Sequence, residues 1–141
     1  MTIRIRAFED RDEDAVVALW QAAGLTRPWN DPHRDIARKK QVQRELFLVA
    51  DDDGVLAGTA MAGYDGHRGW VYYLAVAPDR QGAGLGRLLM REAEARLLAL
   101  GCPKVNVQIR SGNEAVAAFY DHLGYAADGA TGLGKRLIPD A

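Results

Sequence analysis

Several short segments of the chain are compactly hydrophobic or alternate between hydrophobic and polar residues, as β-strands with a buried face do. Residues 3–8 alternate in this way at the N-terminus. Residues 46–50 and 55–64 predict two strands joined by a hairpin turn, in which Gly54 supplies a positive φ. Residues 70–76 are rich in aromatic and β-branched side chains and predict the next strand.

Other segments repeat hydrophobic residues every three to four positions, which predicts amphipathic helices. We expect a first helix that Asp10 caps and Gly24 ends. Pro32 suits the first position of a second helix, with Asp31 as its cap. This second helix is mostly charged and is expected to run to about Arg44.

The clearest helical pattern covers residues 84–100, where one face is hydrophobic throughout. Residues 104–110 then alternate as a strand, Asn113 caps a short helix, and residues 134–138 predict a last strand. The order β-α-α-β-β-β-α-β-α-β indicates an α+β fold on one mixed, mostly antiparallel sheet. We expect six to seven strands and about four helices in a single domain over residues 1–141.

Composition excludes several classes of protein. With 141 residues and a formal net charge of −1, the chain has no overall field that would attract nucleic acid or an anionic membrane. It has no apolar run long enough to span a bilayer and no signal-peptide pattern. Cys102 is the only cysteine, so we expect no disulfide, no zinc site and no other metal. We therefore expect a cytoplasmic protein, a monomer or homodimer.

Three alternate glycines stand between a predicted strand and the strongest predicted helix: Gly82, Gly84 and Gly86. Backbone without side chains can approach a ligand closely. Amide groups at a helix N-terminus, aided by the helix dipole, form a site suited to phosphate. Arg80 and Arg87 would add charge at its rim. The alternative is a glycine-rich connector that binds no ligand.

The chain resembles the GNAT superfamily of acyl-CoA-dependent N-acetyltransferases over nearly its whole length. The signature Gln/Arg-x-x-Gly-x-Gly/Ala of that superfamily is met by residues 81–86, and residues 74–78 precede it as in the family. Asn113 lies seven residues before Tyr120, again as in many members.

Three further segments look like one bacterial subgroup, the YpeA type: residues 25–32, 63–69 and 101–104. Members of that subgroup are acetyltransferases named by similarity. The resemblance therefore gives the class of enzyme and leaves the acceptor open.

The resemblance implies that an acetyl group moves from acetyl-CoA to a primary amine of a small molecule or peptide. The amine would attack the thioester directly in a ternary complex, without metal or covalent intermediate. The residues that the resemblance assigns to the coenzyme are Leu74, Ala75, Val76, Gln81, Gly82, Ala83, Gly84, Leu85, Gly86, Arg87, Asn113 and Tyr120.

Tyr120 is the candidate catalytic residue. It would lie beside the sulfur and protonate the departing thiolate, since a phenol is a suitable acid for a thiolate of similar basicity. The alternative is that Tyr120 only packs its helix. Asn113 would contact the pantetheine end, although it could equally serve as a helix cap alone.

The general base is not evident. Gln108 stands where some family members have a glutamate, and Trp70 falls near the position of a glutamate in others. A histidine can act as a base near neutral pH, but His67 lies in a turn, where most histidines are merely solvated. One of Tyr72 and Tyr73 would line the site, and a water relay without a single base is the alternative.

The acceptor is expected near the loop between the first two helices. Trp29 would form a wall, Asn30 lies beside it, and Asp31 would attract a cationic amine or only cap the second helix. Together with His67 and Tyr72, these residues are the candidate acceptor contacts. A different function is also consistent with the absent glutamate, namely a non-catalytic acyl-CoA-binding regulatory module.

Overall fold

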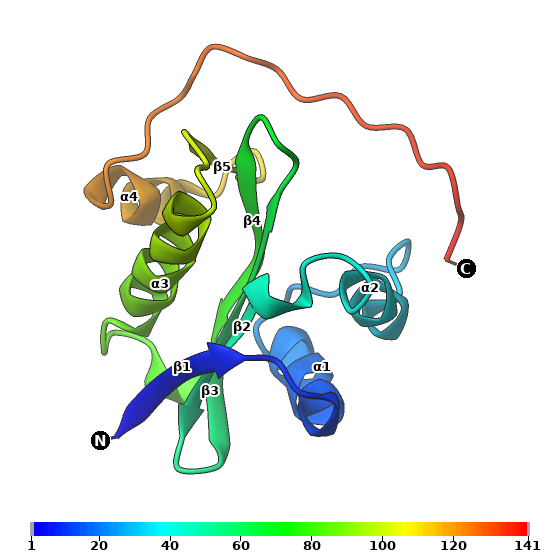
Figure 1. The fold of residues 1–141 in the computed structure, drawn as a ribbon, viewed down its shortest axis with the longest axis vertical. Helices are drawn as coiled ribbons and strands as arrows, with labels where there is room; N and C mark the ends of the chain where they lie inside the picture. The colour runs from blue at the N-terminus through cyan, green and yellow to red at the C-terminus, as the bar shows by residue number, and fades with distance from the viewer. Residues whose placement is uncertain (1, 141) are drawn as a thin grey trace.

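A computed structural model describes residues 2–140 (Figure 1). One sheet has the strand order β1-β2-β3-β4-β5. Its strands are β1 (Ile3–Ala7), β2 (Phe47–Asp52), β3 (Val55–Tyr64), β4 (Gly69–Val76) and β5 (Val105–Val107). The first four strands pair antiparallel, whereas β5 runs parallel to β4.

Four helices cover this sheet. They are α1 (Glu13–Ala22), α2 (Pro32–Lys39), α3 (Leu85–Ala99) and α4 (Glu114–His122). Helices α1 and α2 lie on one side of the sheet and α3 and α4 on the other (Figure 1). The predicted α+β fold with a mixed, mostly antiparallel sheet is confirmed. No helix within residues 2–140 combines the length and hydrophobicity needed to cross a membrane.

The sheet separates two hydrophobic cores because successive side chains of a strand point to opposite faces. Leu48 of β2 packs in the core under α3, together with Leu89. The next residue, Val49, packs in the core under α1, together with Trp20. All four side chains are fully buried. Both faces of the central strands are therefore fixed by packing, so the sheet is a rigid support for the residues at its edge.

The expected number of strands was wrong, because the described sheet has five strands rather than six to seven. The predicted strand at residues 134–138 does not form. Residues 126–140, called here the C-terminal arm, instead run from the end of α4 to α2 without joining the sheet (Figure 1). The arm contains several glycines, and its last described residue, Asp140, is held at α2. Its path therefore leads away from the short strand β5.

Two helix boundaries also differ from expectation. Helix α2 ends at Lys39 rather than near Arg44: the N–H groups of Gln41 and Val42 bond carbonyls three residues back, and Gln43 then adopts a left-handed φ of 51°. The Gln43 side chain bonds both the N–H and the carbonyl of Tyr64 at the end of β3. The cap before the first helical segment is Glu9 rather than Asp10.

Candidate active site

A β-bulge interrupts the pairing of β3 and β4 at the stretch that the resemblance assigns to the thioester. Tyr73 and Leu74 of β4 together stand opposite the single residue Ala60 of β3. Tyr73 takes a φ of 51°, in the left-handed region. That conformation costs about 1–2 kcal/mol for a residue with a side chain. Surrounding contacts must therefore hold it in place.

Those contacts form a chain of buried groups. Thr59 Oγ1 donates a hydrogen bond of 2.8 Å to the Tyr73 carbonyl and accepts one of 2.9 Å from Trp20 Nε1. Trp20 and Thr59 are fully buried. The Tyr73 ring stacks on Trp20 at 3.8 Å, and its hydroxyl donates to Asp35 Oδ2 at 2.6 Å. Burial and the Asp35 carboxylate raise the pKa of Tyr73. Hydrogen bonds thus hold Tyr73 at the bulge through both its backbone carbonyl and its side-chain hydroxyl.

Beyond the bulge, β4 and β5 separate. Their pairing joins only residues 69–71 to residues 105–107. The Ala77 N–H donates to Ala57 on the β3 side, at 2.9 Å. Because successive peptide groups alternate between the two edges of a strand, the Val76 N–H faces the other edge, past the end of the β5 pairing. A backbone donor is therefore available at the place where β4 leaves its neighbour.

The glycine turn that follows uses its three glycines in two ways. Gly82 and Gly84 have φ values of 85° and 81°, which favour glycine. Gly84 is the N-cap of α3, and neither a capping side chain nor an acidic residue occupies the first turn of this helix. Among residues 2–140, therefore, no side chain accepts a hydrogen bond from the first amides of α3, and the first turn holds no acidic residue to offset the positive end of the helix dipole.

Gly86 has a packing role instead. A Cβ at this position would lie 3.1 Å from Phe119 Cζ and 3.8 Å from Val76 Cγ2. The first turn of α3 thus rests directly on α4 and on the end of β4. Of the arginines expected at the rim, Arg80 pairs with Asp52 at 2.5 Å, whereas Arg87 is exposed.

The other residues of this turn that we predicted to bind the coenzyme differ in whether a ligand can reach their side chains or only their backbone groups. Gln81 and Ala83 are exposed, so their side chains are free to meet a ligand. Leu85 and Ala75 are buried in opposite cores, which leaves only their backbone groups available.

Tyr120 lies on α4 with its ring in the core, 6% exposed, edge-on to Phe119 and Tyr125. Burial raises the pKa of Tyr120 to about 12. Its hydroxyl forms no hydrogen bond within residues 2–140, yet no fully buried polar side-chain atom there lacks a partner. The hydroxyl therefore reaches solvent space and is protonated at neutral pH, so it can donate a proton.

A groove runs from the α1–α2 loop past the bulge to α4 and the arm. Five of the predicted site residues line it together: Asn30, Tyr72, Leu74, Asn113 and Tyr120. Asn113 Oδ1 caps α4 by accepting from the Val116 N–H at 3.2 Å, so its amide group stays available. Gln108 also lines the groove.

The remaining acceptor candidates lie elsewhere. Asp31 caps α2, accepting from the N–H groups of His33 and Arg34 at 2.9 and 3.3 Å, as the structural alternative predicted. Trp29 is 51% exposed and lies in a neighbouring pocket. His67 lies in the β3–β4 turn, outside the groove.

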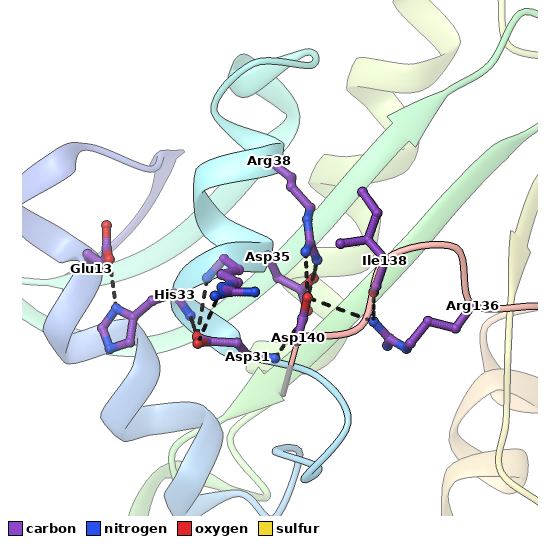
Figure 2. A network of polar contacts seen from close by, with 9 residues as sticks. Glu13, Asp31, His33, Asp35, Arg38, Arg136, Ile138 and Asp140 are labelled. Atoms are coloured by element: carbon purple, nitrogen blue, oxygen red, sulfur yellow. Dashed lines mark hydrogen bonds and ion pairs between the residues drawn. The ribbon is translucent and has the colours of Figure 1, made fainter.

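A polar network at α2 anchors the C-terminal arm (Figure 2). The Asp140 carboxylate is 1% exposed and accepts from the Asp31 N–H at 2.8 Å and from Arg38 at 2.5 Å. Arg38 and the Asp31 N–H lower the pKa of Asp140 to about 2. Arg136 lies 3.8 Å from the same carboxylate and also donates to Asn30. The arm is therefore fixed beside Asn30 and Asp31, two of the residues predicted to contact the acceptor.

Sequence reasoning missed the residues that shape this site. Trp20 and Thr59 carry only the signals of a helix stripe and a strand, and nothing marks Tyr73 for a positive φ. Asp140 gave no signal either, because its partners are about a hundred residues away.

Comparison with known proteins agrees with this geometry. The sequence matches the model of the acetyltransferase (GNAT) family over residues 12–125. An acetyltransferase of Yersinia enterocolitica is 47% identical over 138 residues, or 98% of each chain. The ribosomal-protein-S18-alanine N-acetyltransferase of Escherichia coli superposes with a TM-score of 0.76 at 28% identity, covering 87% of this chain and 77% of that one.

A second solved structure shares the fold. AAC(6')-Iy in complex with the bisubstrate analogue CoA-S-monomethyl-acetylneamine has a TM-score of 0.77 at 15% identity, covering 98% of this chain and 100% of that one. The family match spans most of the chain, and the Yersinia relative spans nearly all of it. The chain therefore belongs to the GNAT family of acetyltransferases.

Proposed function

We propose that the protein transfers the acetyl group of acetyl-CoA to a primary amine, by direct attack in a ternary complex. The observation that carries this proposal is the convergence of three features: the Val76 N–H where β4 leaves β5, the glycine turn before α3, and the Tyr120 hydroxyl. Gly86 joins them physically, because it packs against Val76 and against Phe119 beside Tyr120.

In the proposed complex the donor lies along the end of β4. The amides of residues 82–87 bind the pyrophosphate, for which the uncapped N-terminus of α3 is suited. Backbone groups of residues 74–76 hold the pantetheine arm and the thioester, and the free amide group of Asn113 meets the same arm. The exposed side chains of Gln81 and Arg87 complete the donor site.

The chemistry needs little more than position and proton transfer. The Val76 N–H donates to the thioester oxygen as negative charge develops on it. The neutral amine attacks the carbonyl carbon, the C–S bond breaks, and Tyr120 protonates the departing thiolate. We propose that groove water accepts the proton of the amine, because Gln108 cannot and His67 lies outside the groove. Water then returns a proton to the Tyr120 phenolate.

Related proteins support both halves of this proposal. AAC(6')-Iy is in complex with a bisubstrate analogue, CoA-S-monomethyl-acetylneamine, and the Escherichia coli relative is a ribosomal-protein-S18-alanine N-acetyltransferase. We also propose that residues 1–141 act as one domain, and that the enzyme works in the cytoplasm, where its single cysteine stays reduced.

The first test combines binding and turnover. Acetyl-CoA should raise the melting temperature through preferential binding to the folded state. Mixing with a panel of primary amines should then release thiol, detected by a colorimetric reagent, and add the mass of one acetyl group to one amine. A melting temperature that saturating acetyl-CoA leaves unchanged contradicts the proposal. A shift without turnover on any amine favours the non-catalytic acyl-CoA-binding module.

A further inference from the structure

A second pocket adjoins the groove on its acceptor side. It is lined by Trp29, Arg38 and residues 134–138 of the arm, and is called here the cationic pocket. Arg38 lines the groove as well, so the two spaces share a wall. Arg38 also bonds Asp35, which bonds the Tyr73 hydroxyl at the bulge. The cationic pocket is thus linked, through Arg38 and Asp35, to Tyr73 at the bulge, next to the proposed thioester position.

Positive charge exceeds negative charge in and around this pocket. Arg38 and Arg136 share the Asp140 carboxylate, and Arg38 also pairs with Asp35. Lys135 in the lining forms no ion pair within residues 2–140.

Arg110 adds a further cation, and it too has no carboxylate partner in the described part of the chain. Its guanidinium lies 5.9 Å from the centre of the exposed Trp29 ring. Two cations and an aromatic wall are therefore available to a ligand.

We propose that the cationic pocket binds an anionic group, carboxylate or phosphate, of the acceptor. The acceptor is then a small molecule that carries an amine at one end and a negative charge at the other. This inference rests on the proposed function and specifies its substrate class. The phosphates of the donor are not competitors, because their proposed site at the N-terminus of α3 lies on the other side of the sheet (Figure 1).

The binding test uses protein saturated with CoA, so that the donor site is filled. Phosphoethanolamine and β-alanine probe the two anions, and ethanolamine is the counterpart of phosphoethanolamine that lacks the phosphate. The readout is the ¹⁵N-HSQC signal of the Trp29 indole N–H, assigned with Trp29→Phe. We expect either anionic amine to shift this signal at concentrations at least tenfold below those ethanolamine needs. Equal responses to all three amines would overturn the proposal.

Substitutions that remove the charge of Lys135 test whether the anion binds in the cationic pocket. Lys135→Gln breaks no ion pair among residues 2–140 and should weaken binding of the anionic amine about tenfold, as expected for one charge-assisted contact. Lys135→Arg should restore it, and the exposed control Arg4→Gln on β1 should stay within twofold of wild type. Unchanged affinity in Lys135→Gln contradicts the site. These titrations need no turnover, so a failure of acetyl transfer is seen separately, as absent thiol release.

Discussion

The carbonyl oxygen of Tyr73 accepts a hydrogen bond of 2.8 Å from the hydroxyl of Thr59. Thr59 lies on β3 and Tyr73 at the bulge of β4, so this bond fixes the offset between the two strands. Trp20 holds the same hydroxyl from the opposite side, at 2.9 Å. Thr59, a fully buried residue of the sheet, therefore fixes the backbone immediately before residues 74–76.

Replacing Thr59 with valine keeps the shape and removes the hydroxyl. The Trp20 indole N–H and the Tyr73 carbonyl then lose their shared partner, which should cost about 1–3 kcal/mol of unfolding free energy. Urea denaturation measures this loss. We also expect acetyl transfer to fall roughly tenfold, because the bulge relaxes. Thr59→Ser is the control, since it keeps the hydroxyl and should retain most of the activity. A valine variant as active as the serine variant would show that the bond does not position the site.

The glycines of the turn should respond differently to alanine. At Gly84, with a φ of 81°, alanine adds about 1–2 kcal/mol of strain and should weaken binding of acetyl-CoA. At Gly86, alanine suits a helix but contacts the Phe119 ring. Phe119→Leu should therefore rescue Gly86→Ala and leave Gly84→Ala unchanged. Unfolding free energies of the single and double variants provide the test, and strict additivity for Gly86 and Phe119 argues against the contact.

Local sequence signals predicted the elements whose causes are local. Asp31 and Pro32 start α2, Asn113 caps α4, and residues 55–64 form a strand with the expected bounds. Each depends on hydrogen bonds or packing preferences within a few residues. The same local causes gave the turn at Gly54, with its φ of 91°.

Features set by distant contacts were not predictable in this way. Gln43 ends the second helical region early because its side chain bonds Tyr64, twenty-one residues away. The bulge at Tyr73 depends on Thr59, and the course of the arm depends on Asp140 meeting α2. The glycine turn and the α4 residues were thus visible in the sequence, whereas the shape of the acceptor side was not.

Tyr120→Phe should separate chemistry from binding. Loss of the proposed acid should lower kcat roughly 100-fold, while the melting shift caused by acetyl-CoA stays as in wild type. Because burial raises the pKa of Tyr120 to about 12, ionisation of this phenol should not reduce kcat below pH 10. Tyr125→Phe is a matched control: it loses a bond of 2.6 Å to Glu94 and should affect stability more than turnover. If Tyr120→Phe turns over at the wild-type rate, Tyr120 is not the acid.

The anchor of the arm should depend on pH in one direction. The pKa of Asp140 is about 2 in the folded protein and 3.8 ordinarily, so its contribution is complete above pH 3.8 and is lost as the pH falls through 2. At neutral pH, Asp140→Asn should speed hydrogen exchange of the Asp31 amide, its bonded partner, roughly tenfold. Exchange at Thr59 in the core serves as reference. An Asp31 amide that exchanges equally in both proteins would mean that the anchor is not closed in solution.

The C-terminal arm can change in sequence independently of the folded core. Its residues contribute nothing to either hydrophobic core, and it is held at its far end by the contacts of Asp140 and Arg136. Substitutions, insertions or deletions in residues 126–139 therefore leave the folding of the sheet and the glycine turn almost untouched. Under the proposed function, such changes alter which amine the cationic pocket accepts, while the proposed donor site at the glycine turn stays the same.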